Sequence, residues 1–217
     1  SKERRVTLEN PDIEVRGLIT NSTAYIGLKV SEINRSYFEN RKAQHRPFFS
    51  PISLHPKLAR VMINLSVIKK GETLLDPFCG TGGILIEAGL IGARVIGSDI
   101  EDKMVEGCKK NLDFYDITDY KLFCSDIGDI AKHAAEIDAV VTDFPYGKAT
   151  TTKGEDIRKL YERAFENRPC VLKENGIAVI GLLYKDIFPL GEKYFLLLEI
   201  HGLKSNRGLT HNVALFK

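Results

Sequence analysis

The stretch from Leu74 to Gly83, LLDPFCGTGG, constrains the fold of this chain more than any other. Its apolar start predicts a short buried strand that ends in the acid Asp76. Glycines at 80, 82 and 83 then predict a tight turn, because a residue without a Cβ adopts strained dihedrals and lets a ligand approach the backbone closely. A helical pattern follows from Ile84 to Ala88. Strand, glycine turn and helix form the opening unit of a Rossmann-like nucleotide site.

The glycine spacing excludes two common nucleotide sites. A dinucleotide fingerprint needs a third glycine three residues after the second, and position 85 is Leu. No Gly-Lys-Ser/Thr follows, so the turn is not a P-loop. The acid precedes the glycines, which suits a ligand with no pyrophosphate to place on a helix N-terminus. This D-x-F-x-G-x-G form resembles the motif of S-adenosylmethionine (SAM) binders, in which acid and backbone face the methionine end of the cofactor.

Acidic residues also end the next two apolar runs. The run from Arg94 to Asp99 ends where a second-strand carboxylate takes a ribose diol in Rossmann-like folds. The run from Leu122 to Asp126 ends in a carboxylate suited to accept a hydrogen bond from an adenine amino group. Asp126 is equally suited to cap a helix that begins at Ile127. Acids at successive strand ends, beside the glycine turn, favour a nucleoside ligand over a turn without one.

The fourth apolar run, Ile137 to Thr142, leads into Asp143-Phe144-Pro145-Tyr146-Gly147. This sequence resembles the (D/N/S)-P-P-(Y/F) motif of SAM-dependent amino-methyltransferases. An aromatic amine is a poor nucleophile because its lone pair is delocalised into the ring. A carboxylate and a backbone carbonyl that accept its two N–H bonds favour the tetrahedral nitrogen formed during attack. Tyr146 offers a ring for stacking a base. Most members have Pro where this chain has Phe144, which keeps the carbonyl but predicts a less rigid turn.

Two further regions carry candidate substrate contacts. Residues 32–50 are basic with interleaved aromatics. Their cations and rings, Arg46 among them, can line a nucleic-acid path, and the same residues can form a linker whose charges are solvated. Arg207, Thr210 and His211 lie near the tip of a C-terminal hairpin, where they contact either substrate or solvent.

The predicted elements give an α/β fold. Helices are expected over residues 56–71, 101–115, 129–136 and 157–172, and a fifth strand over 176–183. Strands at 194–201 and 211–216 leave no room for a crossover helix, so they must be antiparallel. The fold class is therefore a Rossmann-like sheet of the SAM-dependent methyltransferase type with a reversed C-terminal hairpin.

An additional hairpin is expected near the N-terminus. Alternating runs at 13–19 and 24–30 flank a turn signal at Asn21-Ser22. An isolated two-stranded hairpin is marginally stable in water, so we expect this one to be the remnant of an upstream domain.

Together these motifs resemble a known family, the archaeal and eukaryotic tRNA guanosine N2-methyltransferases that act at position 10, close relatives of the THUMP-domain tRNA methyltransferases. The stretches that carry the resemblance are residues 45–49, 54–60, 76–83, 142–147 and 209–210. The resemblance implies SAM as cofactor, tRNA as partner and a THUMP RNA-binding domain upstream. The expected domains are then 1–31, the remnant of that domain, 32–50, a basic linker, and 51–217, the methyltransferase domain.

The resemblance also implies roles for individual residues. Asp76, Gly80 and Gly82 would hold the methionine moiety of SAM, Asp99 its ribose and Asp126 its adenine. Asp143 and the Phe144 carbonyl would accept the guanine amino group, and Tyr146 would hold the base. Lys148 stands where Arg is expected. The expected catalytic residues are Asp143, Phe144, Pro145 and Tyr146. The expected cofactor-binding residues are Asp76, Phe78, Gly80, Thr81, Gly82, Asp99, Ile100, Asp126, Ile127 and Asp143. The expected substrate-binding residues are Arg46, Tyr146, Lys148, Arg207 and Thr210.

Composition limits the location and the partners. The net charge of +2 does not demand a nucleic-acid partner, so any basic footprint must be local. No apolar run reaches the roughly 18 residues of a membrane span. The four cysteines lack metal-ligand spacing and are interpreted as reduced thiols of a cytoplasmic protein, and no metal is expected.

Two alternatives to the tRNA reaction stay open. The Asp143 motif also fits DNA or protein amino-methyltransferases. Phe144 keeps open a SAM-binding subunit that no longer catalyses and acts as an RNA-associated scaffold. The sequence leaves undecided whether one or two methyl groups are added and whether a small activator subunit is needed.

Overall fold

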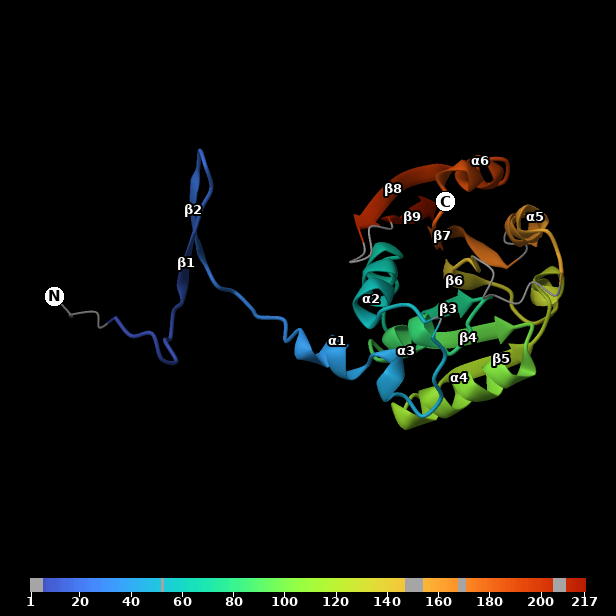
Figure 1. Ribbon diagram of the computed structural model, residues 1–217, viewed down its shortest axis with the longest axis horizontal. Coiled ribbons are helices and arrows are strands. Elements are labelled where there is room, and N and C mark those ends of the chain that lie inside the picture. Colours follow the sequence, from blue (N-terminus) through green and yellow to red (C-terminus); the bar gives the residue numbers. More distant parts are fainter. Residues whose placement is uncertain (1–5, 52, 147–153, 168–170, 205–209) are drawn as a thin grey trace. The chain divides into compact units, whose positions relative to one another are not determined.

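The computed structural model describes residues 6–51, 53–146, 154–167, 171–204 and 210–217 (Figure 1). The chain divides into two compact units, Ser1–Tyr37 and Phe38–Lys217.

The first unit contains the predicted hairpin. Strands β1 (Val15–Ile19) and β2 (Ala24–Leu28) pair antiparallel, with Val15 opposite Leu28 and Ile19 opposite Ala24. The turn is closed by the amide of Thr20, which donates to the Thr23 carbonyl at 2.8 Å. Apolar side chains of the hairpin, such as Ile19 and Ile26, are more than four-fifths exposed. The hairpin therefore buries little apolar surface of its own.

The second unit is built on a seven-stranded sheet with the order β5-β4-β3-β6-β7-β9-β8. The strands are β3 (Thr73–Asp76), β4 (Arg94–Asp99), β5 (Tyr120–Cys124), β6 (Ile137–Asp143), β7 (Leu172–Leu182), β8 (Leu197–Lys204) and β9 (Thr210–Phe216). The first five in this order are parallel, β9 is antiparallel to β7, and β8 is antiparallel to β9. The prediction of a Rossmann-like sheet with a reversed last hairpin is confirmed.

Helices cover both faces of this sheet (Figure 1). Because successive strand residues point to opposite faces, Leu74 joins one hydrophobic cluster and its neighbour Leu75 joins the other. The first cluster includes residues of α2 (Pro56–Leu65), α3 (Gly83–Gly89) and α4 (Asp102–Phe114). The second includes residues of α5 (Ile157–Asn167), α6 (Phe188–Gly191) and the 3-10 helix η2 (Ile127–Lys132). The remaining short elements are α1 (Ser36–Asn40), η1 (Ala43–His45) and η4 (Lys185–Ile187).

Three predicted helices have different bounds in the structure. The helix expected to reach Gly71 ends at Leu65, because Val67 adopts a left-handed φ of 51° that a helix cannot accommodate. The helix expected over 129–136 is the 3-10 helix η2, and Glu136 beyond it has a φ of 54°. The helix expected over 157–172 ends at Asn167, and Leu172 already belongs to β7. The prediction placed Pro169 inside a helix, which a proline disfavours.

Candidate active site

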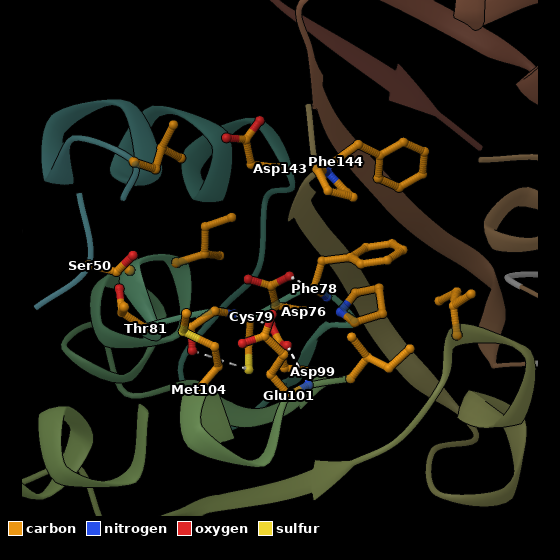
Figure 2. A pocket seen from close by; sticks show the side chains of 18 of the residues that line it. Ser50, Asp76, Phe78, Cys79, Thr81, Asp99, Glu101, Met104, Asp143 and Phe144 are labelled. Carbon is orange, nitrogen blue, oxygen red and sulfur yellow. Dashed lines mark hydrogen bonds between the residues drawn. The ribbon is translucent and has the colours of Figure 1, made fainter. Parts of the chain in front are cut away.

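A cavity of about 570 Å³ opens where β3, β4 and β6 end (Figure 2). The last residues of these strands, Asp76, Asp99 and Asp143, all line it. Ligands of open α/β sheets bind outside the carboxyl ends of the strands, so the cavity lies where the fold predicts a site. Three carboxylates around one cavity make it suited to a ligand with positive charge and hydroxyl donors.

The glycine turn after β3 forms one wall of the cavity. Gly80 and Gly82 have positive φ values of 48° and 81°, which side chains other than glycine rarely adopt. A Cβ at position 82 would lie 2.6 Å from the Sγ of Cys108 on α4, so this glycine also allows close packing. The turn is closed by the amide of Gly82, which donates to the Cys79 carbonyl at 2.8 Å.

Asp76 is the most buried carboxylate of the site, with 2% of its surface exposed. Its Oδ1 accepts hydrogen bonds from the Thr142 hydroxyl at 2.7 Å and from the Phe78 amide at 3.2 Å. Burial raises the pKa of Asp76 to about 7, the two hydrogen bonds lower it in part, and the charges of Asp143 and Asp99 raise it further. A cationic ligand beside Asp76 would relieve this electrostatic cost.

Asp99 connects the second strand to the glycine turn. Its Oδ2 accepts a hydrogen bond from the Gly80 amide at 3.0 Å, and its Oδ1 accepts one from the Glu101 amide at 3.0 Å. Burial raises the pKa of Asp99, while these amides lower it in part. Since a carboxylate oxygen has two lone pairs, each oxygen can still accept a hydroxyl hydrogen from a ligand.

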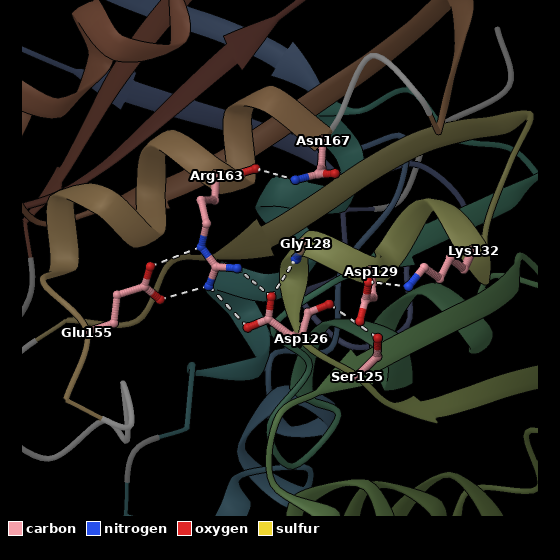
Figure 3. A network of polar contacts seen from close by, with 8 residues as sticks. All are labelled: Ser125, Asp126, Gly128, Asp129, Lys132, Glu155, Arg163 and Asn167. Atoms are coloured by element: carbon pink, nitrogen blue, oxygen red, sulfur yellow. Dashed lines mark hydrogen bonds and ion pairs between the residues drawn. The ribbon is translucent and has the colours of Figure 1, made fainter.

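Asp126 is held by an arginine that the sequence did not indicate (Figure 3). The guanidinium of Arg163, on α5, binds both oxygens of Asp126, at 2.5 and 3.1 Å. The same guanidinium binds both oxygens of Glu155, at 2.9 and 2.7 Å. The Gly128 amide donates to Asp126 Oδ1 at 2.8 Å, so Asp126 also caps η2, as the capping alternative predicted. The hydrogen bonds to Asp126 and Glu155 raise the pKa of Arg163.

The motif that begins at the last residue of β6 sends its first two side chains, Asp143 and Phe144, in opposite directions (Figure 2). Phe144 is 3% exposed, and its ring stacks on Tyr161 of α5 with centroids 4.9 Å apart. Its amide donates to the Gly181 carbonyl of β7 at 3.0 Å. The Tyr161 hydroxyl donates to the Pro145 carbonyl at 2.5 Å. The turn is therefore fixed by hydrogen bonds and aromatic packing, although it lacks the first proline of the usual motif.

The side chain of Asp143 points the other way and meets His211 of β9. The two are separated by 3.0 Å between Oδ1 and Nε2, and His211 is 6% exposed. The sequence placed His211 near a hairpin tip but did not connect it with Asp143.

Comparison with known proteins identifies the family. Residues 43–187 match the family model described as RMKL-like, methyltransferase domain. The chain belongs to this methyltransferase family.

Relatives of this methyltransferase domain include two archaeal proteins named tRNA (guanine(10)-N2)-dimethyltransferase. The one from Methanothermobacter thermautotrophicus is 40% identical over 214 residues, which are 98% of this chain and 63% of the relative. The one from Methanocaldococcus jannaschii is 38% identical over 225 residues, covering 98% of this chain and 60% of the relative. The domain thus spans about three-fifths of these relatives. The crystal structure of TrmN from Thermus thermophilus has a TM-score of 0.70 at 20% identity, covering 97% of this chain and 61% of that one, and supports the fold.

Most predicted site residues line the cavity of the methyltransferase domain. They are Asp76, Phe78, Gly80, Thr81, Asp99, Ile100, Asp126, Ile127, Asp143, Phe144, Pro145 and Tyr146. Gly82 shapes the turn without lining the cavity. Lys148 and Arg207 lie outside the described residues.

Two predicted substrate contacts, Arg46 and Thr210, do not line the cavity. Arg46 is 5% exposed, and its Nε donates to the Arg41 carbonyl at 3.0 Å. Arg46 is therefore a buried residue of the segment before α2, whereas a cation that contacts a nucleic acid would have to be exposed. Thr210 is exposed at the start of β9 and pairs with Lys204 of β8.

Other residues that line the cavity were not predicted from the sequence. Ser50 and Ser53 line it from the segment before α2, which had been assigned to the linker and a helix start. The hydroxyls of Ser53 and Thr81 lie 3.0 Å apart, so this segment contacts the glycine turn. Glu101 and Met104 line it from the start of α4. No group of three or more potential metal ligands occurs within the described residues, and no helix among them is long and apolar enough to cross a membrane.

Proposed function

We propose that this methyltransferase domain transfers a methyl group from SAM to the exocyclic N2 amine of a guanosine in tRNA, at position 10. The observation that carries the proposal is the cavity with Asp76, Asp99 and Asp143 around it. SAM, when bound, supplies a methyl group on a positively charged sulfonium and also carries an ammonium and a ribose diol. The names of the archaeal relatives support tRNA guanine N2 as the acceptor.

The residues present fit this cofactor. Asp76, with its raised pKa, would pair with the ammonium, and Gly80 in its left-handed conformation leaves the turn backbone accessible. Asp99 would accept hydrogen bonds from the ribose diol. Asp126, oriented by Arg163, would accept one from the adenine amino group.

The motif from Asp143 to Tyr146, at the end of β6, would bind the acceptor base. Asp143 and the carbonyl of Phe144 would accept the two N–H bonds of the amine and so favour its tetrahedral form. Tyr146 lines the same cavity, and burial raises its pKa to about 12, so its ring stays neutral at physiological pH and suits stacking on a base. Positioning and hydrogen-bond acceptance would supply the catalysis.

The RNA partner and the domain arrangement complete the proposal. The hairpin of β1 and β2, with its exposed apolar side chains, would be the remnant (1–31) of an upstream THUMP-like domain, joined by a linker (32–50) to the methyltransferase domain (51–217). The protein would act on tRNA in the cytoplasm. If an activator subunit is needed, the rate of tRNA methylation should increase when cell extract is added.

The test uses the full-length protein with labelled SAM and unmodified tRNA transcripts, followed by digestion and identification of the labelled nucleoside. N2-methylguanosine that disappears with Asp143→Ala, while SAM binding persists, supports the proposal. Duplex DNA and a protein lysate in parallel reactions test the two other acceptor classes. Measurable SAM binding without label in any acceptor would favour the scaffold alternative, for which Phe144 was the only feature.

A further inference from the structure

A buried histidine lies behind the proposed catalytic carboxylate. The Nε2 of His211 and the Oδ1 of Asp143 are 3.0 Å apart. Both atoms are fully buried, and within the described residues neither has a well-aligned hydrogen-bond partner, the other atom of the pair included. Buried polar atoms in folded proteins nearly always have a partner. At 3.0 Å each atom is a close polar neighbour of the other, in a contact whose alignment falls short of a hydrogen bond.

Gly181 of β7 makes room for this pair. It lies opposite Asp143 on β6 and opposite Val213 on β9, so the side chains from both neighbouring strands meet over it. A Cβ at position 181 would lie 2.6 Å from Asp143 Oδ1 and 2.7 Å from His211 Nε2. Real Cβ atoms essentially never approach other atoms this closely. A glycine inside a strand weakens it and often marks such a close approach.

The pair also fixes which carboxylate oxygen faces the ligand. Oδ1 of Asp143 is buried, whereas the side chain as a whole is 17% exposed and lines the cavity. Oδ2 is therefore the oxygen on the cavity side. Two acceptor atoms would repel each other at 3.0 Å, so we assign a hydrogen to the Nε2 of His211.

We propose that His211 is the positioning residue of Asp143: its Nε2–H holds Oδ1, so that Oδ2 is aimed at an N–H of the acceptor amine. This inference rests on the proposed function. The contact is close but imperfectly aligned, as is common for catalytic hydrogen bonds that tighten when substrate binds. The same imidazole also packs edge-to-face against Tyr146, with ring centroids 6.1 Å apart and planes at 69°. One histidine thus supports both the carboxylate and the ring proposed to stack on the base.

The test compares two amides that differ by one methylene. In His211→Gln the side-chain nitrogen reaches about as far as Nε2 and can still donate to Oδ1, whereas in His211→Asn it falls short. Both variants carry a polar amide, so any destabilisation of the fold should affect them alike. Such a common effect would not produce a difference in kcat between His211→Asn and His211→Gln. We expect His211→Asn to lower kcat by up to about 100-fold, the effect of misplacing a reacting group by about 1 Å. His211→Gln should recover most of kcat, and the KM for SAM should be unchanged in both.

His201 provides a matched control on the same hairpin. It lies in β8 opposite Val213 of β9, and its Nε2 is 2.8 Å from Glu199 Oε2, so it too forms a histidine–carboxylate pair. It does not line the cavity. His201→Asn should therefore leave kcat unchanged. An independent arm, Gly181→Ala, should lower kcat without raising the KM for SAM, because the new Cβ separates Asp143 from His211.

The outcomes separate this inference from the proposed function. If the wild-type protein methylates tRNA and His211→Asn retains its kcat, the positioning role is wrong and the proposed function stands. Equal losses of kcat in His211→Asn and His211→Gln would also overturn it, since a structural histidine would show that pattern. A wild-type protein that binds SAM but methylates no RNA would overturn both.

Discussion

Replacing Asp76 with Asn should stabilise the ligand-free protein at pH 8. Burial raises the pKa of this carboxyl from 3.8 to about 7. At pH 8 the carboxyl is ionised in both states, and the ionised form has a higher free energy in the folded protein than in the unfolded chain. The difference of about three pH units, at 1.36 kcal/mol each, is worth about 4 kcal/mol. The Asn Oδ1 can still accept the hydrogen bonds from Thr142 and Phe78. The variant should therefore gain up to about 4 kcal/mol at pH 8.

The effect of Asp76→Asn on stability should depend on pH. A carboxyl with a raised folded-state pKa contributes stability that is present below pH 3.8 and is lost as the pH rises through about 7. The advantage of Asp76→Asn should accordingly grow from near zero at pH 4 to its full value at pH 8, measured as free energy of unfolding in urea. SAM affinity should fall about tenfold to a hundredfold, because a hydrogen bond to a charged group is lost.

Asp138→Asn is the matched control with the opposite sign. Burial raises the pKa of Asp138, but hydrogen bonds from Lys173 and from the Thr73 amide outweigh this effect and lower it overall. Its ionised form stabilises the fold above the unfolded pKa, so Asp138→Asn should destabilise the protein at pH 8. Equal stabilities of Asp76→Asn and the wild type at pH 8 would refute the argument that Asp76 is buried at an electrostatic cost.

Three further substitutions test other parts of the molecule. Phe144→Pro should destabilise the protein by about 3 kcal/mol or more in urea unfolding and should not raise activity, because it removes the buried ring and the hydrogen bond from the Phe144 amide to the Gly181 carbonyl. A more active, equally stable variant would contradict this expectation. Glu87→Ala should cost about 3–5 kcal/mol by the same measurement, since Glu87 is 0% exposed and ion-paired with two arginines; a loss below about 1 kcal/mol would show that the network contributes little. Arg163→Lys should raise the Kd for SAM several-fold in calorimetry and leave kcat unchanged, because lysine cannot bind both oxygens of Asp126 as the guanidinium does. An unchanged Kd would show that Arg163 does not contribute to SAM binding.

The sequence was sufficient to predict the fold and the strand-end acids because both depend on local patterns. The strand that ends at Asp76, the one that ends at Asp99 and the one that ends at Asp143 were predicted with these ends. Parallel strands bring their carboxyl ends to one edge of the sheet, so a periodic apolar run followed by an acid is enough to place the carboxylate. Errors arose where local signals conflicted, as at Pro169 in the last predicted helix.

Contacts between distant segments were not predictable in the same way. Arg163 reaches Asp126 across 37 positions of sequence, and one arginine among 31 basic residues carries no local mark of that role. Arg46 was misplaced because a basic, aromatic stretch has the same composition on a surface and in a packed segment. The contacts of both arginines depend on which segments of the chain lie side by side in the fold.

Gly181 is a local sequence signal for the contact between Asp143 and His211. The apolar run of the fifth strand, Ile177 to Leu183, contains one glycine, and a glycine inside a strand often marks a close approach to the backbone. What approaches is set by pairing: β6 brings Asp143 to one side of Gly181 and β9 brings Val213, two residues after His211, to the other. Only a sheet with β9 antiparallel between β7 and β8 puts a histidine from the last hairpin beside the acid of the fourth parallel strand. The reversed hairpin is thus more than a feature of the fold class, because it places a buried imidazole 3.0 Å from the proposed catalytic carboxylate.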